Sequence, residues 1–345
     1  MDDRNRPPPL SGSAATGADF AGAHRSLQEL LGLLSRVIVG QEALVTHLVT
    51  AVFAGGHVLI EGLPGLGKTH LAKALGAALG LRCSRVQCTP DLMPADVTGA
   101  EVYLTQAGGA SRFEFRPGPV FAQLVLVDEI NRATPRTQAA LLEAMQERQV
   151  THGGARHPLP MPFCVLATQN PIELEGTFPL PEAQLDRFMF KLEVPFPGPD
   201  TLRAMLDVSL DAEPADTIVP IAGPEDVVRV GALARRVLVG ERCKAAAVDL
   251  VASTQPVGDD AAREDAGARR HIRYGASPRA LQALVRAARV RALIEGRAHV
   301  DVADLEAVAL PVLRHRVLLR LESELDGLDA DGALAAVIEG WRSRL

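Results

Sequence analysis

The sequence predicts an α/β fold with a mostly parallel sheet flanked by helices, followed by a smaller, all-helical second domain. Between about residues 57 and 195, short apolar runs alternate with segments of helical periodicity. Such alternation favours a parallel sheet that is covered by helices on both faces. The proline-rich stretch 195–199 ends this pattern, and helical periodicity continues towards the C-terminus. We therefore expect a core domain over residues 23–196 and a helical domain over 200–345, preceded by a disordered tail over 1–22.

The core pattern contains five apolar runs of strand length and two shorter pairs that interrupt the alternation. The five runs lie at 57–61, 84–87, 124–128, 163–168 and 188–194. Each interrupting pair flanks two consecutive glycines and predicts a β-hairpin, one near 102–115 and the other near 150–159. These hairpins are either decorations of the sheet or elements that contact a partner.

Bulk properties disfavour several classes of protein. The chain of 345 residues is long enough for two domains, and its formal net charge of -6 disfavours nucleic-acid binding, which usually requires a basic excess. The four cysteines, Cys83, Cys88, Cys164 and Cys243, lack the spacing of a metal site, so we expect buried free thiols. No apolar run is long enough to span a membrane, and the N-terminus lacks the apolar core of a signal peptide. These features predict a cytoplasmic protein.

The run from Gly62 to Thr69, GLPGLGKT, carries the strongest chemical signal in the chain. It follows one of the predicted strands, and apolar residues at helical spacing come after it. Glycines in this pattern allow backbone N–H groups to surround a polyphosphate at the positive end of the following helix. Lys68 would then neutralise charge on the β- and γ-phosphates, and Thr69 would offer its hydroxyl to Mg²⁺. The sequence therefore predicts a nucleoside triphosphate site.

A second signal is the pair of carboxylates at the end of the apolar run 124–128. Asp128 and Glu129 would lie at the C-terminal edge of the sheet, where ligands bind in folds of this kind. There Asp128 could hold Mg²⁺, and Glu129 could orient and deprotonate a water molecule. Taken alone, the pattern also fits a strand that ends in ordinary solvated acids. The phosphate-binding loop favours the catalytic interpretation.

The apolar run 163–168 is also followed by polar residues, of which Asn170 directly precedes a proline. A neutral amide at this position could donate a hydrogen bond to the γ-phosphate or to the attacking water. It could instead cap the turn before Pro171, which is a common role of asparagine. We favour the phosphate contact.

Five segments, taken in order, resemble the motifs of MoxR-type AAA+ ATPases: 62–69, 128–133, 167–171, 185–188 and 275–280. The segments 91–99 and 176–183 lie in the intervals where that family has further motifs. The resemblance covers roughly residues 25–340. It implies an AAA+ core that binds nucleotide and a smaller, all-helical lid domain.

The resemblance also implies roles for individual residues. Asn170 matches sensor 1, and Arg279, at the start of a lid helix, matches the sensor-2 arginine that reaches back to the γ-phosphate. Arg187 matches the arginine finger that is supplied to the nucleotide of a neighbouring subunit. Taken alone, Arg279 could be a solvent-exposed arginine of a first helical turn, and Arg187 could be an ion-pair partner of Asp186.

These assignments define two overlapping sets of residues. The catalytic residues would be Glu129, Lys68, Asn170, Arg187 and Arg279, with Thr69 and Asp128 as ligands of Mg²⁺. The segment 37–41 resembles the part of the family that packs on the adenine. The full set that would contact the nucleotide is Val39, Gly40, Gly62, Pro64, Gly65, Leu66, Gly67, Lys68, Thr69, His70, Asp128 and Arg279.

The implied function is an ATP-hydrolysing remodelling factor with a chaperone-like action on a protein client. The resemblance implies a frequent partner with a von Willebrand factor A domain. ATP and Mg²⁺ would be the cofactors, and an arginine finger supplied in trans implies a homo-oligomer, expected to be a hexameric ring.

Three alternatives to this function stay open. One is the ATPase subunit of a magnesium-chelatase-like complex, another is a nucleic-acid motor, and the third is a scaffold that binds ATP without turnover. The acidic balance of the chain disfavours the motor. The scaffold is disfavoured because no catalytic residue of the family pattern is missing.

Overall fold

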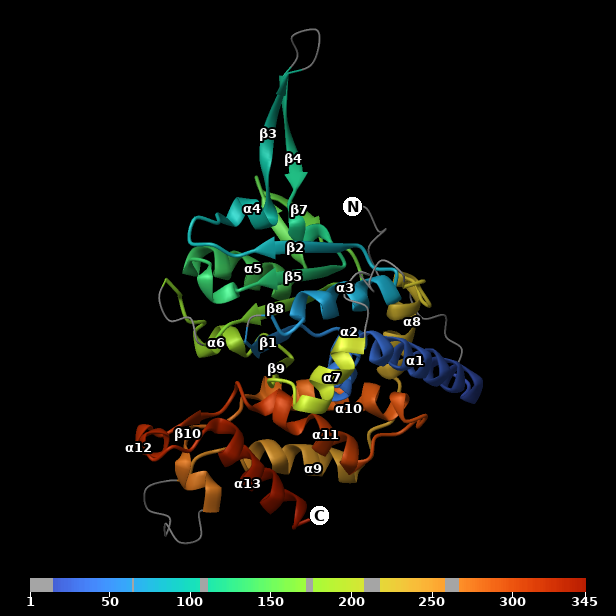
Figure 1. Cartoon of the computed structure of the whole chain (residues 1–345), viewed down its shortest axis with the longest axis vertical. Helices are drawn as coiled ribbons and strands as arrows, with labels where there is room; N and C mark the ends of the chain where they lie inside the picture. The colour runs from blue at the N-terminus through green and yellow to red at the C-terminus, as the bar shows by residue number, and fades with distance from the viewer. Residues whose placement is uncertain (1–14, 64, 106–110, 172–175, 208–217, 258–266) are drawn as a thin grey trace.

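A computed structural model describes residues 15–63, 65–105, 111–171, 176–207, 218–257 and 267–345. At its centre lies a five-stranded sheet in the order β2-β5-β8-β1-β9, and all neighbouring strands are parallel (Figure 1). Its strands are β1 Val58–Gly62, β2 Cys83–Gln87, β5 Leu124–Asp128, β8 Cys164–Gln169 and β9 Phe190–Val194. Each strand overlaps one of the five predicted apolar runs, so the parallel α/β core is confirmed.

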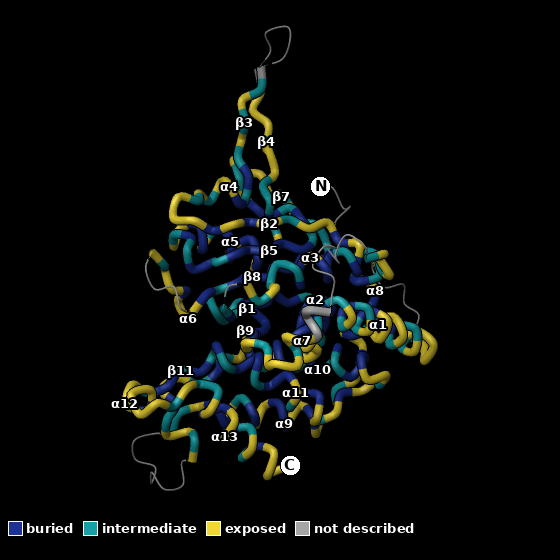
Figure 2. The backbone as a smooth tube through the Cα atoms, viewed as in Figure 1, coloured by how far each residue is buried: buried dark blue, intermediate teal, exposed yellow. Residues whose placement is uncertain are grey.

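Alternating side chains on the central strands point to opposite faces of the sheet and build two apolar cores. In β5, Leu124 and Leu126 belong to one core, whereas Val125 and Val127 belong to the other. The first core lies against α1, α2 and α3 and continues into the C-terminal helices, and the second lies against α5. Figure 2 shows the central strands of this sheet largely buried, whereas the edge strand β2 is more exposed. The helices of the core region are α1 Gly17–Val37, α2 Glu42–Ala54, α3 Lys68–Ala78, α4 Pro94–Thr98, α5 Pro135–Glu147 and α6 Glu182–Leu185, with 3₁₀ turns η2 Pro119–Phe121 and η3 Ile130–Arg132.

Both predicted hairpins are present. Strand β3 (Gly99–Thr105) pairs with β4 (Ser111–Pro117), and this hairpin projects away from the body of the molecule (Figure 1). The glycine pair at its predicted turn lies outside the described residues. The second hairpin pairs β6 (Gln149–His152) with β7 (Ala155–Pro158). Its turn residues, Gly153 and Gly154, have φ of 56° and 78°, which explains why the sequence has glycine there.

Residues 200–345, which we call the lid, are mainly helical, as predicted. One element was not predicted: β10 (Ile272–Tyr274) and β11 (Leu318–Leu319) form a small antiparallel sheet. Ile272 and Leu319 are buried in the apolar core of the lid. Strands this short leave no periodic signal in a sequence. The helices beyond β9 are α7 Pro199–Asp207, α8 Pro224–Ala234, α9 Glu241–Ala252, α10 Pro278–Ile294, α11 Val302–Leu313, α12 Leu321–Leu325 and α13 Ala330–Arg342, with the 3₁₀ turn η5 Gly267–His271.

The first helix begins earlier than we predicted. We expected a disordered tail as far as residue 22, but α1 starts at Gly17. Thr16 and Asp19 cap this helix reciprocally. The Asp19 N–H donates to Thr16 Oγ1 (3.3 Å), and the Thr16 N–H donates to Asp19 Oδ2 (2.7 Å). This cap corrects the boundary of the tail, while residues 1–14 lie outside the described part of the chain.

The described residues include all four cysteines, each as a free thiol. Cys88, Cys164 and Cys243 are buried, as predicted, whereas Cys83 is exposed at the start of the edge strand β2. Burial raises the pKa of Cys88 and that of Cys164 to about 12. In the described ranges, no helix has both the length and the apolar character that a membrane span requires.

A buried histidine joins three elements at the N-terminal edge of the sheet. The Val165 N–H donates to His57 Nδ1 (3.0 Å), so Nε2 carries the proton and donates to the Met145 carbonyl (3.2 Å). Complete burial lowers the pKa of His57 from 6.5 to about 4. The fold therefore requires the neutral imidazole at this position.

We predict that His57 makes the fold sensitive to acid. The unfolded chain takes up a proton at this residue near pH 6.5, and the folded chain does so only near pH 4. The free energy of unfolding should therefore fall as the pH decreases through this window, with a slope of at most about 1.4 kcal/mol per pH unit from one histidine. Urea unfolding of His57→Gln, whose amide can still donate and accept, should show a shallower slope. The slope should not vanish, because burial also lowers the pKa of His47 to about 4. An identical slope in the variant and in the wild type would contradict this role.

Candidate active site

The phosphate-binding loop joins β1 to α3, as the sequence predicted. Gly65 and Gly67 have φ of 82° and 76°, so the backbone itself favours glycine at both positions. An added Cβ at either residue would meet no atom within 4 Å, which leaves open space above the loop. At the N-terminus of α3, Lys68 Nζ donates to the Gly62 carbonyl at 2.6 Å. The ammonium is thereby held over the loop.

The two predicted acids lie at the end of β5, and one threonine ties them together. Asp128 is the last residue of the strand, and Glu129 follows in a left-handed conformation with φ of 56°. The Glu129 N–H donates to Thr168 Oγ1 on the neighbouring β8 (2.9 Å), and the same hydroxyl donates to Asp128 Oδ1 (3.4 Å). A non-glycine residue in this conformation is strained and persists where its surroundings hold it. Thr168 is one of the contacts that hold Glu129.

The two acids also influence the pKa of Lys68. Its partial burial lowers the pKa of the ammonium, while the carboxylates of Asp128, Glu129 and Glu61 act in the opposite direction, Asp128 most strongly. The loop and the end of β5 therefore face one another across a single site.

Sequence reasoning missed two side chains of β2 that contact the acids. Arg85 Nε donates to Asp128 Oδ2 at 2.7 Å, and Gln87 Nε2 donates to Glu129 Oε2 at 3.1 Å. Residues 85 and 87 are separated by two positions, so both project from the same face of the strand. That alternation in the strand adjacent to β5 is the signal that could have revealed them.

The remaining residues predicted for the nucleotide lie around the same edge. Asn170 directly follows β8 and is buried. Leu66 is half-buried against the apolar core, and Thr69 and His70 belong to the first turn of α3. Pro64 lies outside the described residues.

The predicted adenine segment lies between α1 and α2. Val39 is half-buried, and Gly40 has φ of 72°. A Cβ at Gly40 would collide with the side chain of Thr201 in α7. This segment is therefore in close contact with the first helix of the lid.

Arg187 lies at the opposite edge of the sheet. It precedes β9, and the nearby Met189 N–H donates to the His57 carbonyl at 2.7 Å, beside the start of β1. The phosphate-binding loop follows the other end of β1. Strand geometry of about 3.3 Å per residue separates these two ends by roughly 15 Å. The loop and Arg187 of one chain thus lie at opposite ends of the same strand.

Arg279 lies on the same side as Arg187. It is about half exposed, and its Nη1 lies 3.7 Å from Asp186 Oδ2. Arg187 Nη1 donates to the Leu142 carbonyl at 2.7 Å, so its partner is a backbone oxygen in the middle of α5. The structure therefore brings the two arginines together, but at Asp186 and not at the phosphate-binding loop of their own chain. This placement differs from our expectation that Arg279 reaches back to the γ-phosphate of its own chain.

A strongly cationic cleft of about 810 Å³ opens at this edge, between the core and the lid. Burial, followed by the charges of Arg286 and Arg235, lowers the pKa of Arg148 in its wall. Among the described residues, one acid, Asp186, contributes to the lining. The arginines that line the cleft are Arg148, Arg187, Arg235, Arg279, Arg286, Arg289 and Arg316. Such a surface favours an anionic partner.

The residues at the C-terminal edge fit a nucleoside triphosphate with Mg²⁺. The loop leaves open space at the N-terminus of the 11-residue helix α3, where backbone N–H groups and an ammonium favour phosphate. The Thr69 hydroxyl and the Asp128 carboxylate supply oxygen donors, which Mg²⁺ prefers.

Comparisons with known proteins agree with this geometry. The family model described as the ATPase family associated with various cellular activities (AAA) matches residues 57–190, and the AAA lid domain matches 264–334. YeaC of Bacillus subtilis is 38% identical over 317 residues, covering 91% of this chain and 94% of that protein. The chaperone MoxR1 of Mycobacterium tuberculosis is 37% identical over 331 residues, covering 96% of this chain and 85% of that protein.

The chain belongs to the MoxR family of AAA ATPases. A crystal structure of a protein from Cytophaga hutchinsonii has the same fold, with a TM-score of 0.83 and 35% identity over 93% of this chain and 96% of that one. Membership in the family implies ATP hydrolysis and a chaperone-like role. The geometry described above shows which residues of this AAA ATPase lie where that chemistry requires them.

We predict that Thr168→Val lowers kcat, because valine keeps the shape of threonine but leaves the Glu129 N–H without its acceptor. Loss of a buried hydrogen bond worth about 1–3 kcal/mol corresponds to roughly a 5- to 150-fold decrease if it is expressed in the rate. Thr168→Ser keeps the hydroxyl and is the matched control, with a rate near that of the wild type. Steady-state ATP hydrolysis measures both variants. Equal rates for the valine and serine variants would show that the hydroxyl does not position Glu129.

Proposed function

We propose that this AAA ATPase works as a ring in which one copy holds each nucleotide and arginines of the next copy complete the site. One observation supports the proposal above all: the phosphate-binding loop and the acids occupy one edge of the sheet, whereas Arg187 and Arg279 occupy the other. A head-to-tail contact between identical copies brings these two edges together. Such contacts close into a ring when the rotation permits, and a hexamer is the expected ring.

Within one copy, the residues at the C-terminal edge bind and orient the substrate. The loop N–H groups, Lys68 and Thr69 hold the β- and γ-phosphates, and Val39 and Gly40 pack on the adenine. Thr69 and Asp128 would hold Mg²⁺, which neutralises phosphate charge when it is bound. Glu129 accepts a proton from the attacking water, and Gln87 orients its carboxylate. Asn170 donates to the γ-phosphate or to that water.

The neighbouring copy contributes positive charge. Arg187 acts as the arginine finger, a contribution that is typically worth about 10³–10⁵ in rate. Because Arg279 shares an edge with Arg187, we propose that it also acts on the neighbour's nucleotide. This proposal replaces the contact with its own phosphates that the family resemblance implied.

We further propose that the ring remodels a protein client in the cytoplasm, with a partner that carries a von Willebrand factor A domain. The family supports this class of function, and the relative MoxR1 is named as a chaperone. The projecting hairpin offers a contact surface. Tyr103 and Phe113 are 59% and 68% exposed there, with ring centroids 5.2 Å apart. The net charge of -6 does not support a nucleic-acid partner.

Subunit mixing tests the shared site. Glu129→Gln and Arg187→Ala should each lose most ATP hydrolysis, because the first lacks its base and the second supplies no finger. The two variants are mixed in equal amounts. Where an Arg187→Ala subunit lies next to a Glu129→Gln subunit, the first supplies Glu129 and the second supplies Arg187, so about one site in four becomes competent. The mixture should therefore recover activity that neither variant has alone.

Arg342→Ala is the control for loss of an arginine, since Arg342 is exposed and pairs only peripherally with Glu306 at 3.5 Å. Its activity should match the wild type. Mixed rings that contain both inactive variants and still hydrolyse no ATP would contradict a finger supplied in trans.

The hairpin is tested in the Glu129→Gln background, which should hold ATP and retain bound client. Replacement of both Tyr103 and Phe113 by serine should abolish co-purification of the client and leave basal ATP hydrolysis of the otherwise wild-type protein unchanged. Glu114→Ser, an exposed change on the same hairpin, should retain the client. Equal recovery of client with and without the aromatic pair would remove the hairpin from the contact surface.

A further inference from the structure

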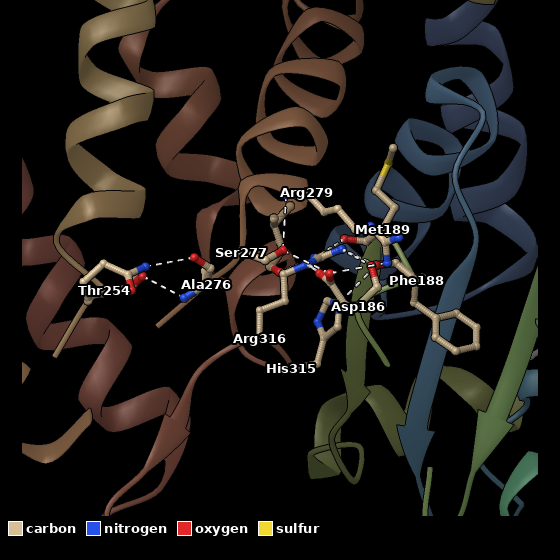
Figure 3. A network of polar contacts seen from close by, with 11 residues as sticks. Asp186, Phe188, Met189, Thr254, Ala276, Ser277, Arg279, His315 and Arg316 are labelled. Atoms are coloured by element: carbon tan, nitrogen blue, oxygen red, sulfur yellow. Dashed lines mark hydrogen bonds and ion pairs between the residues drawn. The ribbon is translucent and has the colours of Figure 1, made fainter. Parts of the chain in front are cut away.

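A lid arginine, Arg316, reaches across to the segment that carries Arg187 (Figure 3). Its side chain is only 3% exposed, and its Nε donates to Asp186 Oδ1 at 2.7 Å. Its Nη2 donates to the carbonyls of Asp186 (3.1 Å) and Phe188 (2.5 Å), and its Nη1 donates to that of Met189 (3.1 Å). One guanidinium therefore bonds to residues on both sides of Arg187.

Other lid side chains contact the same segment. Ser277 Oγ donates to Asp186 Oδ2 at 3.0 Å, on the side that Arg279 approaches. His315 Nε2 lies 3.1 Å from the Phe188 carbonyl, and burial holds the pKa of this histidine well below 6.5, so it donates as a neutral ring. The lid thus supplies donors to the polar groups of this core segment.

Within the described part of the chain, few contacts hold the side chain of Arg187. Its Nη1 donates to the Leu142 carbonyl, and its buried Nε has no hydrogen-bond partner among the residues that the structure describes. The direction of Arg187 therefore depends largely on the backbone of residues 186–189, which is the part that Arg316 holds.

We propose that Arg316 is a positioning residue for Arg187 and couples the arginine finger of each copy to the lid of that same copy. The inference rests on the proposed function, in which Arg187 acts on the nucleotide of the neighbouring copy. A shift of the lid changes the bonds from Arg316 to Asp186, Phe188 and Met189. Arg187 then leaves its place at the neighbour's γ-phosphate, and the position of one lid sets the activity of the next site.

The pattern of bonds distinguishes this role from that of a simple ion pair. An ion pair between Arg316 and Asp186 would require only the carboxylate, and buried pairs alone add little stability. Arg316 instead uses its planar donors on a carboxylate and on three carbonyl oxygens of residues 186–189, and it also donates to the Val312 carbonyl within the lid. The carbonyl bonds connect the lid to the backbone on either side of Arg187.

The test uses the mixing experiment with Arg316→Met. Alone, this variant should lose about 10²-fold in kcat, the scale of a misplaced catalytic group, with KM nearly unchanged because its own nucleotide site is intact. Mixed with Glu129→Gln, it should recover activity as Arg187→Ala does, since the Glu129→Gln subunits supply well-placed fingers. Mixed with Arg187→Ala, it should recover nothing, because neither protein supplies a finger.

Arg314→Met is the matched control. Arg314 lies two residues away and also joins the lid to the core, through Glu193 at 3.5 Å, while its second ion pair, with Asp331 at 2.5 Å, lies within the lid. Neither ion pair involves residues 186–189, so this variant should keep nearly the activity of the wild type.

The outcomes separate this inference from the proposed function. Glu129→Gln could restore activity when mixed with Arg187→Ala but not when mixed with Arg316→Met. This result would overturn the positioning role of Arg316 and leave the shared site intact. Failure of both pairs would reject the shared site itself. If Arg316→Met does not fold, Arg316→Lys and Asp186→Asn replace it and should show a smaller loss with the same pattern of complementation. Wild-type activity in both of these variants would also overturn the inference.

Discussion

The common direction of the five parallel strands is the constraint on which the rest of the structure depends. Every strand of the sheet delivers its last residue to one edge and its first to the other. The phosphate-binding loop, Asp128 and Asn170 follow strand ends, whereas Arg187 precedes a strand. A rigid sheet keeps the phosphate-binding loop and the backbone of Arg187 roughly 15 Å apart, whichever rotamers their side chains adopt. Within one copy, Arg187 therefore lies away from the phosphate-binding loop, and this separation is the basis of the shared site proposed above.

Buried hydrogen bonds determine the geometry at both edges. At the first edge, the Thr168 hydroxyl accepts from the Glu129 backbone and holds it in a left-handed conformation. At the second, Arg316 donates to the backbone that surrounds Arg187. In both cases a buried polar side chain fixes the backbone of a residue that the sequence predicts for the active site. The cost of burying these groups is met by complete or nearly complete hydrogen bonding.

The sequence predicted the elements that contiguous residues define, and it missed contacts between residues that lie far apart in the chain. The strands, the loop and the two acids are defined by contiguous residues, and β5 begins and ends where the pattern indicated. Arg85 contacts Asp128 across 43 positions, and Arg316 contacts Asp186 across 130. The pairing of Arg316 with Asp186 leaves no local signal, because only the fold brings the partners together, and the alternation in β2 indicates a shared face but not the partner of Arg85. The placement of Arg279 beside Asp186 has the same cause, since it depends on how the lid packs on the core.

The lid contacts both edges of the core that carry predicted site residues. Its first helix, α7, lies against Gly40 in the segment predicted to pack on the adenine, and the residues after α11 hold the segment around Arg187. Helix α2 connects these places: it begins just after Gly40 and, at about 1.5 Å per residue, ends roughly 20 Å away beside the start of β1. Residues beyond β9 are therefore in contact with the core at two distant places, the predicted adenine segment at one edge and the segment that carries Arg187 at the other.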